Sequence, residues 1–169
     1  MAVSADEFRH ALAQLASGVT VVTTRDTTGR PLGLTVSSFC SVSLDPPLVL
    51  VCLDRRVEAN AGLAACGRFA VSVLAEGQEE ISQRFSSGGA EKFAPPGLAE
   101  CPDGLPVIEG ALAHISCRLR ATHEGGDHLI HVGEVEWTSV RPGPPLAYQR
   151  RRYQRLQGEA EEPAGRMPV

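Results

Sequence analysis

Aromatic side chains are scarce in this chain of 169 residues, making up 5% of it against a hydrophobic content of 43%. A core with so few rings must be built mainly from small aliphatic side chains. Positive charge is not in excess either, because 16 Lys and Arg residues stand against 20 Asp and Glu residues, giving a net charge of −4. A nucleic-acid-binding face is normally basic, so this balance argues against a nucleic-acid partner. The length suits one domain with its own core.

Long apolar segments are also lacking. The longest apolar run, LVLVCL at 48–53, is far too short to cross a bilayer, so we expect no membrane partner. Residues 1–16 carry Asp6, Glu7 and Arg9 between their apolar positions, so we expect no signal peptide.

No Cys-x-x-Cys pair occurs, and the number of cysteines is odd. The favoured interpretation is reduced, buried thiols in a cytoplasmic protein, and the alternative is disulfide bonds. The five cysteines are Cys40, Cys52, Cys66, Cys101 and Cys117.

Familiar catalytic signatures are missing. The chain contains no Gly-x-Gly-x-x-Gly after a strand, no Walker A sequence and no Gly-x-Ser-x-Gly elbow. His128 and His131 resemble a metal-binding pair, but they fall on a predicted strand. Residues three apart in a strand point to opposite faces and do not easily chelate one ion, so we predict no metal site.

Hydrophobic periodicity and turn residues divide the chain into short elements. The stretches DTTG at 26–29 and EGGD at 124–127 predict hairpins. Hairpins dominate and no helix alternates regularly with strands, so we predict a mainly β fold, a small antiparallel β-barrel with short helical insertions. The predicted helices are 4–16, 55–66 and 78–85, and the predicted strands are 19–24, 33–44, 48–53, 68–75, 112–123 and 128–140.

Three of these segments carry more detailed expectations. Ser4 and Glu7 predict a capping box for a helix with Phe8, Leu12 and Leu15 on its apolar face. The strand at 48–53 is continuously apolar and is expected to be buried on both faces. Residues 86–105 are expected to form a long loop.

The predicted strand at 33–44 has hydroxyl groups on both of its faces. Ser37, Ser38 and Ser41 offer donors there, while Arg84 and Lys92 supply cations further along the chain. Hydroxyls and a few cations suit a phosphorylated heterocycle as ligand. The alternative is that the serines are merely tolerated in an edge strand and that the cations are solvated.

Four segments together resemble the short-chain flavin reductases of two-component monooxygenases, in order along the chain from about residue 8 to residue 153. They are GLTVSSFCSVSLDPPLVLVCLD, RFAVSVLAEGQEEISQRFS, LPVIEGALAHISCRLRATHEGGDHLIHVGEVEWTSV and PLAY. The resemblance implies an FMN-binding split-barrel domain at 1–153 and a homodimer. It implies that NADH or NADPH reduces FAD or FMN, which then passes to a separate monooxygenase. The polar, acidic tail at 154–169 is expected to be disordered.

The same resemblance implies a set of flavin-binding residues. His128 would lie near the nicotinamide and is the one candidate catalytic residue, the alternative being an exposed histidine at the base of a hairpin. Contacts to the flavin ring or its side chain are implied for Thr35, Val36, Ser37, Ser38, Cys40, Ser41, Val42, Cys52, Leu53 and Asp54. Contacts to phosphate or nucleotide are implied for Arg84, Phe85, Lys92, Phe93, Tyr148 and Tyr153.

Two segments depart from the family pattern. Val57-Glu58-Ala59-Asn60 stands where the family usually has a Ser and a Thr that meet phosphate; Asn60 can replace one of them, but Glu58 would repel phosphate. Arginines occupy positions 150–152, where the family often has Gly, either as phosphate contacts or as a solvated patch. The choices between FAD and FMN and between NADH and NADPH therefore stay open.

Hydride transfer between two cofactors needs no tuned protein acid or base, which agrees with the missing catalytic signatures. Three other functions remain open at this point. The chain could be a flavin-binding carrier or sensor without reductase activity, a flavoprotein oxidase with its own organic substrate, or a barrel without a small ligand.

Overall fold

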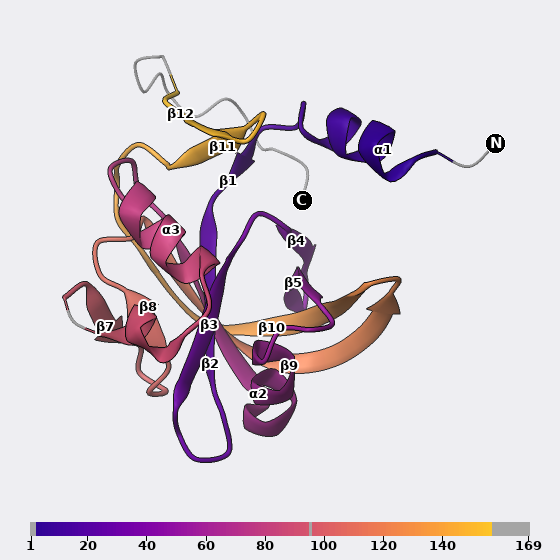
Figure 1. Ribbon diagram of the computed structural model, residues 1–169. Helices are drawn as coiled ribbons and strands as arrows, with labels where there is room; N and C mark the ends of the chain where they lie inside the picture. The colour runs from indigo at the N-terminus through magenta and orange to yellow at the C-terminus, as the bar shows by residue number, and fades with distance from the viewer. Residues whose placement is uncertain (1–2, 95, 157–169) are drawn as a thin grey trace.

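The computed structural model describes residues 3–94 and 96–156. Their centre is a seven-stranded antiparallel sheet with the strand order β3-β2-β6-β9-β10-β5-β4 (Figure 1). The strands are β2 (Thr20–Arg25), β3 (Pro31–Val36), β4 (Phe39–Leu44), β5 (Pro47–Asp54), β6 (Arg68–Val73), β9 (Ala113–Gly125) and β10 (His128–Val140).

The two edge strands of this sheet, β3 and β4, follow one another directly in the chain. Only Ser37 and Ser38 separate them. The three steps from Val36 to Phe39 reach roughly 11 Å when fully extended, so the two edges of the sheet must come together. The sheet therefore curls into a barrel, which confirms the predicted mainly β, split-barrel fold.

The predicted continuous strand at 33–44 is wrong, because the chain breaks at Ser37 and Ser38 and changes from one sheet edge to the other. Ser38 is held against β5: its Oγ donates to the carbonyl of Cys52 at 2.7 Å, and the Cys52 N–H approaches the Ser38 carbonyl oxygen at 3.3 Å. The hydroxyls lose their strand alternation at the point where the barrel closes.

Smaller elements lie around the barrel. Strands β1 (Ser17–Gly18), β11 (Ala147–Gln149) and β12 (Arg152–Gln154) form a separate sheet at the top of Figure 1. The predicted loop at 86–105 contains a 3-10 helix, η1 (Ala90–Phe93), and the strand β7 (Leu98–Glu100), which pairs with β8 (Pro106–Ile108). The predicted tail starts inside β12, at Gln154, and its part from 157 onwards lies outside the described residues.

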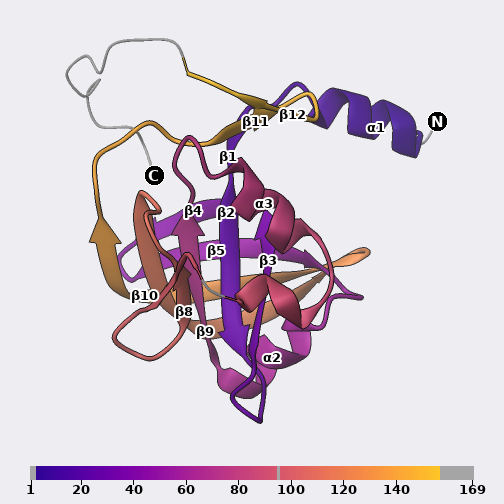
Figure 2. The same ribbon diagram turned by 60° about the vertical axis from the view of Figure 1, so that its left-hand side comes forward.

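The three α-helices of the described segments are α1 (Ala5–Leu12), α2 (Ala59–Cys66) and α3 (Glu79–Ser86). Ser4 and Glu7 form the predicted capping box of α1. Helix α2 starts four residues later than predicted, because a turn from Asp54 to Val57 precedes it, and Gly67 ends it in the left-handed conformation. In Figures 1 and 2, α1 projects away from the barrel, while α3 lies beside β3.

The main core is aliphatic, as the composition requires, and fills the barrel. Strand β5 alternates within it: Val49, Val51 and Leu53 are buried, whereas Leu48 and Leu50 are only partly covered. The expectation of burial on both faces is therefore wrong, because within the described residues no layer fully covers the outer side of this strand.

All five cysteines are free. Cys101 and Cys117 are buried, but Cys40 is exposed on β4, so the expectation of uniformly buried thiols is corrected at that position. In the part of the chain that the structure describes, no helix is long and apolar enough to cross a membrane.

Candidate functional site

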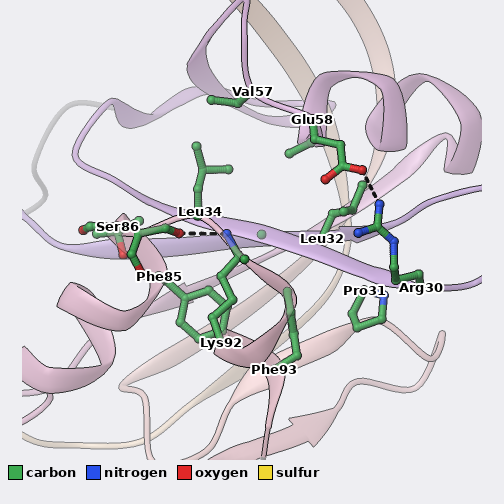
Figure 3. A pocket seen from close by; sticks show the side chains of 16 residues that line it. Arg30, Pro31, Leu32, Leu34, Val57, Glu58, Phe85, Ser86, Lys92 and Phe93 are labelled. Carbon is green, nitrogen blue, oxygen red and sulfur yellow. Dashed lines mark hydrogen bonds and ion pairs between the residues drawn. The ribbon is translucent and has the colours of Figure 1, made fainter.

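A cavity of about 400 Å³ lies between β3, the start of α2 and the segment that joins α3 to η1 (Figure 3). Leu34 and Val57 line one side of it, and Phe85 and Phe93 line another. The two phenyl rings meet edge to face with their centroids 5.1 Å apart. Apolar walls of this kind suit a flat ring system.

Three charged side chains also line the cavity. Lys92 points into it and donates from Nζ to the carbonyl of Ser87 at 3.2 Å (Figure 3). Burial lowers the pKa of Lys92, while the negative charge of Glu58 acts in the opposite direction. Arg30 forms an ion pair with Glu58 on the far side of the cavity. A partly desolvated ammonium with spare N–H donors is a suitable contact for phosphate.

A second hollow of about 140 Å³ adjoins the first, since Thr35 and Ser86 line both. It lies between the end of β3, helix α3 and the β11–β12 hairpin. Tyr153 donates from Oη to Ser82 Oγ at 2.9 Å, and its ring meets that of Tyr148 with centroids 5.4 Å apart. The two tyrosines therefore form one wall of this second hollow.

These two hollows bring together eight of the residues that the resemblance implied. They are Thr35, Val36, Ser37, Phe85, Lys92, Phe93, Tyr148 and Tyr153. Their segments are far apart in the sequence, and together they supply apolar surface, hydroxyls and one ammonium. The donor set fits a phosphorylated aromatic ligand such as a flavin nucleotide.

Arg84 does not line either hollow. Its Nη1 approaches the carbonyl of Pro96 at 3.4 Å, and its guanidinium lies 5.6 Å from the centroid of the Phe85 ring. Its Nε and Nη2 atoms are buried. In this conformation Arg84 supports the segment behind the cavity and leaves Lys92 as the cation that faces it.

A second group of implied residues lies where β5 and β10 pair. Asp54 and His128 are direct partners in that register. Hydrogen bonds from Arg56 hold the pKa of Asp54 well below its usual range. His128 is 43% exposed, and its Nδ1 lies 2.7 Å from Asp127 Oδ1. His128 is thus accessible to a ligand and oriented by a carboxylate.

Other residues of the implied set face elsewhere. The side chain of Leu53 belongs to the core, which leaves only its backbone available to a ligand. Cys52 is half-buried, and burial raises the pKa of its thiol. Cys40, Ser41 and Val42 are exposed on the edge strand β4.

A part-buried hydrogen-bond chain connects β10 to the turn that follows β5. Asn60 donates from Nδ2 to the Asp54 carbonyl at 2.8 Å, so its Oδ1 must be the atom that faces His131 Nε2 at 2.9 Å. His131 Nε2 therefore carries a proton, and His131 Nδ1 accepts from Thr122 Oγ1 at 3.0 Å. Sequence reasoning considered His131 only as half of a metal pair; its partners lie too far along the chain to be read from spacing.

The spatial arrangement agrees with a family match. Residues 12–157 match the family described as flavin reductase like domain. The chain belongs to that family. It is 40% identical over 164 residues to the reductase subunit HsaB of a flavin-dependent monooxygenase from Rhodococcus jostii, covering 96% of this chain and 84% of that one.

Two further relatives are similar over most of their length. The chain is 42% identical over 160 residues to a flavin reductase (NADH) from Kitasatospora aureofaciens, covering 90% of this chain and 82% of that one. The structure superposes with a TM-score of 0.87 on SgcE6, an NADH:FAD oxidoreductase of Streptomyces globisporus, at 35% identity and covering 95% and 99% of the two chains.

Proposed function

We propose that this protein is an NAD(P)H-dependent flavin reductase that reduces free FAD or FMN and supplies it to a separate monooxygenase. The two adjoining hollows carry this proposal, because they present the ammonium of Lys92, the ring of Phe93 and the two tyrosines around the shared Thr35. The relatives named as NADH-dependent reductases, and as the reductase subunit of a monooxygenase, support the same activity.

The bound flavin and nicotinamide supply the hydride chemistry of this reaction. The protein contributes positioning and exclusion of water. Phe85 and Phe93 give apolar surface to the cleft, and Lys92 places a positive charge where a phosphate can meet it. Ser37 lines the narrower hollow, beside the tyrosines.

The proposal places His128 beside the nicotinamide. Its Nδ1 is engaged by Asp127, which leaves Nε2 directed toward a ligand. Because the reacting atoms belong to the two cofactors, His128 acts by orienting the reductant.

A homodimer completes the proposal, in a cytoplasmic protein whose cysteines stay reduced. The apolar side chains of α1 and of the turn after it are exposed: Phe8 by 59% and Leu12 by 49% in the helix, and Leu15 by 66% beyond it. A projecting helix with an uncovered apolar face is suited to cover a second copy of the chain. Light scattering is expected to give twice the chain mass of 18.0 kDa, and a monomer at micromolar concentration would overturn this part.

Release of reduced flavin distinguishes a supplier from a carrier. We would place the protein, NADH and FAD on one side of a dialysis membrane under anaerobic conditions, with FAD and NADH on the other. Reduced FAD is expected to accumulate on the protein-free side faster than in a control without protein. Flavin binding with no reduction above that control would favour the flavin carrier instead.

A further inference from the structure

One of the charged side chains that line the cavity is negative. Among the described residues that line it, Glu58 is the only acid, and the cations are Arg30 and Lys92. Glu58 pairs with Arg30, and its charge also acts on Lys92 across the cavity. In Figure 3 the Glu58 carboxylate lies over the opening that the Lys92 ammonium faces from below.

Arg30 is held from two sides, which limits what it can offer a ligand. Its Nε donates to Asp26 Oδ2 at 3.0 Å, and its Nη2 donates to Glu58. The Asp26 carboxylate is fixed in turn by Thr28, whose hydroxyl donates to Oδ1 at 2.7 Å. Two carboxylates therefore neutralise one guanidinium, and Lys92 remains the only uncompensated cation of the described cavity lining.

Glu58 has no part in capping the helix that it begins. It stands at the N-cap of α2, yet its side chain makes no capping hydrogen bond. Its charged contact in the cavity is with Arg30. The carboxylate is therefore free to act on an anion that enters the cavity, and replacing it by an amide breaks no capping hydrogen bond.

We propose that Glu58 is a specificity residue that makes this cavity discriminate against a phosphate monoester. A monoester carries about −1.5 to −2 charges at neutral pH, because its second pKa is near 6. FMN differs from riboflavin, and NADPH from NADH, by one such group. Its charge meets Glu58 with no free guanidinium to balance it, so Glu58 lowers the affinity that FMN gains over riboflavin and disfavours NADPH relative to NADH.

The expected change in affinity is small because the two charged side chains are exposed to solvent. The side chains of Arg30 and Glu58 are 45% and 63% exposed, so solvent screens the charges. Removing the Glu58 charge and releasing Arg30 Nη2 should change phosphate monoester affinity about two- to fivefold, within the range of an exposed charge pair. Added salt should reduce the change.

This inference rests on the proposed function. The experiment therefore has different outcomes for a wrong role of Glu58 and for a wrong proposed function. Dissociation constants of riboflavin, FMN and FAD are measured for the wild type, E58Q and R30Q. The ratio of FMN to riboflavin affinity isolates the monoester, and the NADPH to NADH ratio of KM isolates the 2′-phosphate. The control is Glu100→Gln, because Glu100 also pairs with an arginine, is likewise 63% exposed and does not line the cavity.

E58Q is expected to raise the relative affinity for FMN or for NADPH about two- to fivefold, R30Q to lower it, and E100Q to leave it unchanged. A gain confined to FMN would place the flavin phosphate in the cavity, and a gain confined to NADPH would place the pyridine nucleotide there. Unchanged ratios in E58Q, with flavin still bound, would overturn the role of Glu58. Absence of any flavin binding by the wild type would instead overturn the proposed function.

Discussion

The buried imidazole of His131 should make the protein less stable in mild acid. His131 is 2% exposed, and burial lowers its pKa from the ordinary value of 6.5. Its neutral form is fully used, with Nε2 donating to Asn60 and Nδ1 accepting from Thr122. Protonation would turn Nδ1 into a donor, which the Thr122 hydroxyl can accept, so its cost is the charge placed on a buried ring.

The direction and size of this change in stability with pH follow from proton linkage. The unfolded chain takes up a proton at His131 near pH 6.5, whereas the folded chain takes it up only at lower pH. Stability is therefore fully present above the unfolded pKa and is lost as pH falls through the window below it. Between pH 7.5 and pH 5.5 the loss from this one group is at most about 1.4 kcal/mol.

Urea unfolding at pH 7.5, 6.5 and 5.5 measures this loss in the wild type and in His131→Gln. Glutamine can still donate to Asn60 but does not titrate, so its curve should lose less stability in acid, by up to about 1.4 kcal/mol. The other histidines are common to both proteins and cancel in the comparison. Equal pH dependence in the two proteins would refute the assignment of a neutral, buried His131.

The remaining predictions separate binding from structure. Ser37→Ala should weaken flavin binding about three- to tenfold without changing stability, because Ser37 lines the cleft. Ser38→Ala should instead lower the free energy of unfolding by about 1 kcal/mol, because the Ser38 hydroxyl ties the barrel closure to Cys52. Fluorescence titration measures flavin affinity and urea unfolding measures stability in both variants. A loss of stability in Ser37→Ala and a loss of flavin affinity in Ser38→Ala would contradict the placement of the two serines. His128→Ala should raise KM for NADH up to about tenfold with a smaller change in kcat. Complete loss of flavin reduction at saturating NADH would make His128 essential to the chemistry.

Local patterns predicted the elements that depend on neighbours in the chain. The capping box of α1 and the β2–β3 and β9–β10 hairpins follow from spacing and turn residues alone. The strand break at Ser37 and Ser38 could not be predicted in this way. It exists because the two edges of a seven-stranded sheet meet there, and that meeting is set by pairings across the whole chain.

The candidate site also combines residues that could be predicted from the sequence with contacts that could not. The resemblance supplied Lys92, Phe93 and the tyrosines, which the fold brings to one cleft. It did not supply the pairing of Arg30 with Glu58, 28 positions apart, or that of His131 with Asn60, 71 positions apart. Such contacts depend on the curvature of the barrel, and no periodicity in the sequence encodes them.

The most direct test of the central claim is NADH oxidation by the purified protein with and without added flavin. We would follow the nicotinamide absorbance after adding FAD or FMN in large excess over protein. Rapid NADH loss that depends on added flavin and continues for many turnovers is the expected result. No flavin-dependent loss with either NADH or NADPH would contradict the account and leave a flavin carrier, or an oxidase with another reductant, as the function of this site.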